Sequence, residues 1–173
     1  MIYCEKELSL TVGILAANKS FEQIRTSYES VFSLRYEASR LVAIMESEDD
    51  SELKQKKINY IKKGICLTSM IDELCKVSST DWIYIVFAGR KLPKNIDGKL
   101  SRYIQSYKDV IFPVVNRVWN FVDGSLDGLL INKKFHSEVG NFGSGDNLNF
   151  TKLVWADKAM SLGARFKAIV GAT

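Results

Sequence analysis

Three short apolar runs constrain the fold of this chain more than any other feature of its sequence. They cover residues 8–17 (LSLTVGILAA), 41–45 (LVAIM) and 82–87 (WIYIVF). Continuous apolar runs of this length, rich in branched side chains, are typical of strands whose two faces are both buried. Segments with helical periodicity separate them, so the runs indicate strands of one central, mainly parallel sheet.

The segments between the runs predict helices. Ser20 precedes an amphipathic stretch and Gln23 lies three residues further on, which is a capping-box pattern. Alternation of strands and helices predicts crossover connections and a single three-layer α/β domain. The expected strands are 10–15, 41–45, 83–87, 111–115, 117–122, 128–132 and 166–170. The further expected helices are a charged one ending at about residue 63, one capped by Thr68 or Ser69, and those at 95–107 and 149–162.

The composition excludes several classes of protein. The net charge of the 173 residues is +4, and the basic run at 54–63 follows an acidic run at 46–52, so we expect no nucleic-acid partner. No apolar stretch approaches the roughly 20 residues of a transmembrane segment. Residues 1–7 carry charges and no apolar region of signal-peptide length, so we expect no signal peptide. The three cysteines form no CxxC pair, which favours buried thiols in a reducing compartment. We therefore expect a cytoplasmic protein, and its oligomeric state is unknown.

The carboxyl ends of the predicted strands are the expected place for a ligand, because open parallel sheets bind ligands there. These ends are at residues 17–18, 46–50 and 88–90. The acids at 46–50 could accept hydrogen bonds from a ribose or a base, although a polar loop before a helix has the same composition. The glycine-rich stretch at 139–147 is a lid, an acceptor loop or a plain connection.

Five segments resemble, in the right order, the family-two glycosyltransferases of the GT-A fold. LSLTVGILAANKS is similar to their first strand, and LVAIMESEDD is similar to their second strand with its acidic end. DWIYIVFAGRKLPKNIDGKL resembles their strand, metal-binding turn and helix. GLLINKKFHSEVGNF and KAMSLGARFKAIV resemble the start of their acceptor region and their final element. The resemblance covers nearly the whole chain, and typical members of the family are longer.

The resemblance implies one nucleotide-diphospho-sugar transferase-like domain over residues 1–173. Residues 1–115 would be its nucleotide-binding half, and residues 116–173 its acceptor-side half. It implies a nucleotide sugar as substrate and a glycan or other acceptor of unknown identity. The nucleoside pocket that the resemblance implies is lined by Ala16, Asn18, Glu46, Glu48 and Asp72. For Asp72, an exposed position on a helix surface is the alternative.

The segment that matches the metal-binding turn departs from the family pattern. The family has two aspartates separated by one residue, whereas this chain has Phe87, Ala88, Gly89 and Arg90. In the family, those aspartates bind the divalent ion that neutralises the diphosphate. Because this chain lacks them, we expect no metal site and no cofactor. Arg90 and Lys91 are expected to bind the diphosphate directly, because guanidinium groups pair with phosphate oxygens. A solvated turn is the alternative.

The sequence identifies no catalytic residue. The family's base is a carboxylate shortly before the final glycine, where this chain has FTKL at 150–153. Asp157 is the nearest acid and His136 is the only histidine, so both are minor candidates, and we expect His136 to be exposed at a helix end. Three functions stay open. They are a glycosyltransferase without the standard metal site, a catalytically inactive GT-A-fold module that binds a sugar nucleotide or glycan, and an unrelated α/β nucleotide-binding domain.

Overall fold

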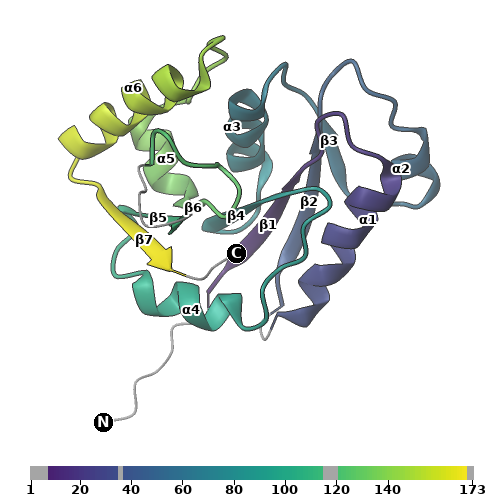
Figure 1. Ribbon diagram of the computed structural model, residues 1–173, viewed down its shortest axis with the longest axis horizontal. Coiled ribbons are helices and arrows are strands. Elements are labelled where there is room, and N and C mark those ends of the chain that lie inside the picture. The colour runs from purple at the N-terminus through teal and green to yellow at the C-terminus, as the bar shows by residue number, and fades with distance from the viewer. Residues whose placement is uncertain (1–7, 35–36, 115–120, 171–173) are drawn as a thin grey trace.

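A seven-stranded sheet forms the centre of the computed structural model, which describes residues 8–34, 37–114 and 121–170 (Figure 1). The strands lie in the order β3-β2-β1-β4-β6-β5-β7. Their bounds are β1 Leu10–Leu15, β2 Ser39–Ile44, β3 Tyr60–Lys62, β4 Trp82–Phe87, β5 Asp109–Val114, β6 Leu130–Asn132 and β7 Arg165–Val170. The helices are α1 Phe21–Ser30, the short 3-10 helix Val31–Ser33, α2 Ser51–Gln55, α3 Leu67–Val77, α4 Ile96–Tyr103, α5 Lys133–Val139 and α6 Leu148–Ser161.

Parallel pairing dominates the sheet. β1 is parallel to β2 and β4, β2 is parallel to β3, and β5 is parallel to β7, while β6 is antiparallel to β4 and β5. The four main strands predicted from the sequence are all present, with small shifts at their ends. The prediction of a single α/β domain with a mainly parallel sheet is therefore confirmed.

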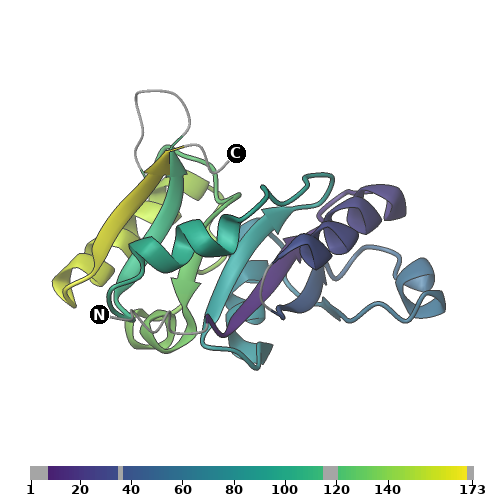
Figure 2. The same cartoon turned by 90° about the horizontal axis from the view of Figure 1, so that it is seen from below.

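Two layers of helices cover the sheet (Figures 1 and 2). α1 and α4 pack on one face through Ile24 and Ile96. α3, α5 and α6 cover the other face through Leu74, Phe135 and Trp155. In the described part of the chain, none of the helices is long and apolar enough to cross a membrane.

The central strand β1 is buried along its whole length, and its glycine lets α3 approach closely. A β-carbon at Gly13 would lie 2.7 Å from Leu74 Cδ1 and 3.3 Å from Ile85 Cδ1. Glycine within a strand often marks such an approach, because it adds no side chain to the contact. Gly13 therefore fixes how close α3 lies to the sheet.

The segment between β2 and α3 differs from its prediction. The charged helix expected to end at about residue 63 is wrong, because α2 ends at Gln55 and β3 follows. Lys57 has a left-handed backbone with φ 54°, which a helix cannot continue through. Tyr60 and Ile61 then pack into the two opposite cores. That alternation is the geometry of a strand.

Two other boundaries were predicted incorrectly or fall outside the described residues. The N-cap of α3 is Cys66 rather than Thr68 or Ser69. Ser69 instead lies in the first turn, and its Oγ accepts the N–H of Cys66 at 3.1 Å. The strand expected at 117–122 lies mostly outside the described residues, and its described end forms a turn.

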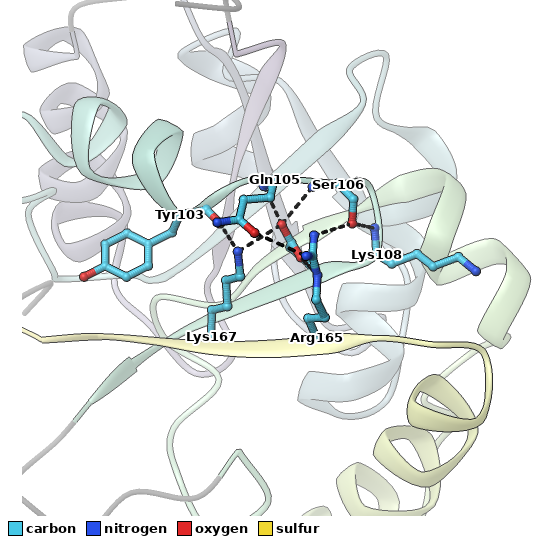
Figure 3. Close-up of polar contacts among 7 residues, drawn as sticks. Tyr103, Gln105, Ser106, Lys108, Arg165 and Lys167 are labelled. Atoms are coloured by element: carbon cyan, nitrogen blue, oxygen red, sulfur yellow. Dashed lines mark hydrogen bonds and ion pairs between the residues drawn. The ribbon is translucent and has the colours of Figure 1, made fainter.

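A buried carboxylate joins the end of α4 to β5 and β7 (Figure 3). Asp109 is 0% exposed and accepts the backbone N–H groups of Gln105 and Ser106, the latter at 2.8 Å. From β7, Arg165 Nε donates to Asp109 at 2.8 Å and Lys167 Nζ donates at 3.4 Å. Because Asp109 takes two amides that a longer helix would use, α4 ends before them, earlier than predicted.

We expect Asp109→Asn to lower the free energy of unfolding by about 1.5–3 kcal/mol, the value of hydrogen bonds to a charged group. The side chain keeps its size, but the two cations of β7 lose their countercharge. Urea unfolding of both proteins at pH 7 measures the difference. Glu22→Gln removes an exposed carboxylate paired with Arg25 and serves as the control, with a midpoint that should stay nearly unchanged. Equal losses in the two variants would contradict the expectation.

The contribution of Asp109 should also depend on pH. Burial acts to raise the pKa of Asp109, but the two backbone N–H groups and the two cations outweigh it and hold the pKa below its usual value. Such a group stabilises the fold above its unfolded pKa of about 3.9 and loses that effect as the pH falls through its folded value. The difference in unfolding free energy between wild type and Asp109→Asn should therefore stay constant from pH 7 to about pH 5 and shrink as the pH falls below about 4. A difference that did not shrink there would argue against this account.

Candidate functional site

The candidate site lies at the edge of the sheet where β1, β2 and β4 end. These strands are mutually parallel, so their carboxyl ends meet there. Backbone hydrogen bonds extend the pairing into the loops, with Ala16 N–H donating to Ala43 O and Ala88 N–H donating to Leu15 O, both at 2.9 Å. The three loops are thereby held side by side, as in the ligand sites of other open parallel sheets.

An open pocket of about 260 Å³ lies at this edge. Three of the residues predicted to form the nucleoside pocket, Ala16, Asn18 and Glu48, line it together. Glu46 and Asp72 do not line it. Its volume approaches the lower end of the range for small-molecule sites, about 300–1,000 Å³. The remaining lining residues are Lys19, Phe21, Ile24, Ile44, Asp49, Glu52 and Leu53.

Glu48 ties together the loops that follow β1 and β2. Its Oε1 accepts the N–H of Asn18, and its Oε2 accepts the N–H of Met45 at 2.7 Å. Asn18 has a left-handed backbone with φ 54°, a conformation that asparagine adopts more readily than most residues. Each carboxylate oxygen has a second lone pair, so Glu48 can still accept a hydrogen bond from a ligand.

The turn after β4 packs against the helix that lines the pocket. Gly89 has φ 98°, and its N–H donates to Ser27 Oγ at 3.0 Å and to Gln23 O at 2.9 Å. Ser27 Oγ in turn donates to Arg90 O at 2.6 Å. Both helix residues belong to α1, which also supplies pocket residues. The turn and the pocket are therefore neighbours across the first half of α1.

Arg90 is paired with a carboxylate that the sequence analysis did not identify. Its Nε lies 3.1 Å from Asp127 Oδ2, and Asp127 Oδ1 accepts the N–H of Phe87 at 2.7 Å. The Asp127 side chain is 11% exposed, and burial raises its pKa although Phe87 N–H and Arg90 act to lower it. Asp127 precedes Gly128, and an Asp-Gly pair predicts a turn but no contact across the sheet.

The residues at this turn do not fit a divalent cation. Both oxygens of Asp127 already have partners, and one partner is a cation that would repel a metal. A hard divalent ion takes six or more oxygen ligands, carboxylates among them. Within the described ranges, no group of three or more His, Cys, Asp or Glu side chains is arranged to hold a metal. Arg90 and Lys91, both exposed, are the charges at this turn that could face a diphosphate.

His136 is buried, so the expectation of an exposed histidine at a helix end is wrong. The side chains of His136 and Asp72 are 4% and 7% exposed, and His136 Nε2 lies 2.9 Å from Asp72 Oδ1. Asp72 also accepts the N–H groups of Phe142 at 2.9 Å and Gly143 at 3.0 Å. Trp155 stacks on the rings of His136 and Phe142. Asp72 therefore anchors the glycine-rich loop to α3 and does not lie on a helix surface.

A lysine occupies the stretch where the resemblance places the catalytic carboxylate. Lys152 is 0% exposed, its Nζ donates to Gly124 O, and burial lowers its pKa. Asp157 lies further along α6 and is exposed. Neither Asp157 nor His136 lines the pocket. The described residues thus form an open pocket and a turn with two exposed cations, and neither candidate catalytic residue lies at the pocket.

Solved structures share the fold of this chain, although no protein-family model and no curated protein matches its sequence. The mannosyltransferase PcManGT from Pyrobaculum calidifontis, in complex with GDP-Man and Mn2+, aligns with a TM-score of 0.72 and 12% identity, over 96% of this chain and 57% of that chain. TarS of S. aureus aligns with a TM-score of 0.65 and 10% identity, over 95% of this chain and 35% of that chain. TarS 1-349 in complex with UDP-GlcNAc gives a TM-score of 0.64 and 13% identity, over 94% and 56%.

The aligned region is a part of each of these proteins, because this chain spans 57%, 35% and 56% of their lengths. At 10–13% identity, the likeness concerns the fold and does not extend to substrate or activity. The sheet that carries the pocket and the cationic turn therefore has the GT-A-like fold of these glycosyltransferases.

Proposed function

We propose that this chain binds a nucleotide diphospho-sugar at the carboxyl edge of its sheet and transfers the sugar to an acceptor without the paired-aspartate metal site. The observation that carries this proposal is that one helix, α1, contacts both the pocket and the cationic turn. α1 lines the pocket with Ile24 and holds the turn through Ser27. A nucleoside in the pocket would direct its diphosphate along α1 toward Arg90. The fold supports the proposal, since PcManGT and TarS were solved with GDP-Man and UDP-GlcNAc.

The charges around the pocket favour this orientation of the ligand. Asn18 and Glu48 offer hydrogen bonds to a ribose or a base, and the other side chains of the lining include several apolar ones. The lining contains three carboxylates and a single ammonium group, that of Lys19. This excess of negative charge repels a diphosphate. Arg90 and Lys91 are therefore the better place for it.

We expect UDP or GDP to bind equally well in manganese and in EDTA, because the cations at the turn belong to the protein. Arg90→Ala should weaken binding by about 1.5–3 kcal/mol, the value of a hydrogen bond to a charged group. Isothermal titration calorimetry measures both effects. Arg102→Ala, an exposed arginine on α4, is the matched control and should leave the affinity unchanged. Binding that requires manganese would contradict the proposal and would direct attention to the acids at 48–50.

A substitution at Asn18 tests the pocket itself. Glycine accepts the left-handed φ of 54°, so Asn18→Gly removes the side chain without straining the backbone. Loss of one ligand hydrogen bond should weaken nucleotide binding by about 0.5–1.5 kcal/mol in calorimetry. Asn95 has a similar φ of 59° but does not line the pocket, which makes Asn95→Gly the matched control. Equal effects of the two changes would mean that the pocket is not the binding site.

One observation favours a second function, a catalytically inactive module that binds a sugar nucleotide or a glycan. Lys152 is buried against Gly124 in the stretch where the resemblance places the catalytic carboxylate. The minor candidates do not replace it, since Asp157 is exposed away from the pocket and His136 is paired with Asp72. Such a module would bind the donor and leave the glycosidic bond intact.

Turnover separates these two functions. UDP-GlcNAc and GDP-mannose would be incubated with the protein and a mixture of glycan acceptors, and the released nucleoside diphosphate would be measured. We expect release by the wild-type protein and none by Arg90→Ala, because the leaving diphosphate needs a countercharge. Donor binding without release would support the inactive module. Failure of any nucleotide to bind would contradict the transferase and the sugar-nucleotide module, and would leave only a module that binds a glycan.

A further inference from the structure

Asp127 is the most constrained charged side chain at the turn after β4. Its Oδ1 accepts the N–H of Phe87 at 2.7 Å, and the side chain is 11% exposed. The next residue, Gly128, donates its N–H to Ile85 O at 2.8 Å. Both the carboxylate and the backbone beside it are therefore attached to β4. Asp127 is a fixed negative charge, whatever its ion-pair partner does.

Arg90 is the exposed member of the pair. Its side chain is 61% exposed, and its closest approach to Asp127 is through Nε, at 3.1 Å. Within the described residues, its guanidinium has no other ion-pair partner. A guanidinium carries five N–H donors in a planar fork. Most of these donors are therefore available to an anion while Asp127 sets the direction of the group.

Two other roles for Asp127 conflict with this geometry. A metal ligand needs a carboxylate oxygen that faces the ion, but the two oxygens of Asp127 face Phe87 N–H and Arg90. An ion pair that masks Arg90 would shield the cation from solvent, whereas 61% of the arginine side chain stays exposed. Orientation of the arginine is the role that agrees with both observations.

We propose that Asp127 is a positioning residue, which orients the guanidinium of Arg90 toward a phosphate group of the ligand at this turn. The proposal rests on the proposed function in assigning the diphosphate to Arg90. A long side chain held in its binding conformation loses less entropy when the ligand arrives, so it binds more tightly than a free one. The carboxylate also repels the phosphate, but its side chain is only 11% exposed whereas that of Arg90 is 61% exposed, so a ligand from solvent meets the guanidinium first.

Asp127→Asn separates the charge of this residue from its place in the fold. Asparagine keeps an oxygen that accepts the N–H of Phe87, but it has no charge to pair with Arg90. Asp81→Asn, at an exposed aspartate just before β4, is the matched control. Calorimetry with inorganic pyrophosphate in EDTA is the measurement. We expect Asp127→Asn to weaken pyrophosphate binding about ten-fold, and Asp81→Asn to leave it unchanged.

A double-mutant cycle distinguishes positioning from a merely structural role. If Asp127 acts through Arg90, then Asp127→Asn should add no further loss to Arg90→Ala. Equal losses in the two backgrounds would overturn the inference. Tighter binding by Asp127→Asn would also overturn it, because Asp127 would then shield Arg90 from the anion. An effect that appears only with manganese would overturn it too, because Asp127 would then be a metal ligand. Failure of the wild-type protein to bind pyrophosphate would overturn it as well.

Nucleotide titrations keep this inference separate from the proposed function. If UDP and GDP bind no more tightly than pyrophosphate, the nucleoside pocket fails as a proposal while the result for Asp127 and Arg90 stands. If UDP binds tightly and depends on Arg90, but Asp127→Asn has no effect, the inference alone fails. The two proposals therefore fail on different measurements.

Discussion

The parallel pairing of β1 with both β2 and β4 is the constraint on which the rest of this structure depends. Because the three strands run in the same direction, the loops that follow them gather at one edge of the sheet. β1 itself is buried along its length, and Gly13 admits the side chain of Leu74 from α3. Unpaired polar groups cannot be accommodated inside such a core without a large cost. The polar side chains of the proposed site therefore lie on the loops at the edge, where the pocket and the cationic turn are found.

Carboxylates at and near the loops serve mainly as acceptors for backbone N–H groups. Four acids each accept at least one N–H group that lies at the end of a helix or strand or in a loop. They are Glu48, Asp72, Asp109 and Asp127. Buried N–H groups need partners, and one carboxylate can satisfy two of them. These acids are therefore occupied with holding loops in place. Acids near the edge of the sheet can in this way order its loops, and among the described residues they form no cluster that could hold a metal.

The sequence predicted those parts of the fold that depend on local pattern. The apolar runs located β1, β2, β4 and β5, and the capping box at Ser20 and Gln23 is formed as expected. β3 was missed because Tyr60 and Ile61 lie in a charged segment, and their burial depends on a neighbouring strand. The burial of His136 has the same cause, since it depends on a residue 64 positions away in the sequence. Within the candidate site, Ala16, Asn18 and Glu48 could be placed together from the strand ends, whereas Asp127 could not, because its contacts cross the sheet.

The charge at the turn after β4 limits what the proposed metal-free site could contribute. Arg90 and Lys91 together match the charge of a divalent ion, but Asp127 offsets part of it. Both cations are exposed, so salt screens their attraction for a phosphate beyond about 8–10 Å. Excess charge alone would therefore attract a diphosphate only at short range. A guanidinium held in a fixed direction can compensate, because two parallel N–H bonds to one phosphate depend on geometry more than on net charge. Under the proposed role of Asp127, the carboxylate that lowers the charge of the turn is also the group that orients its arginine.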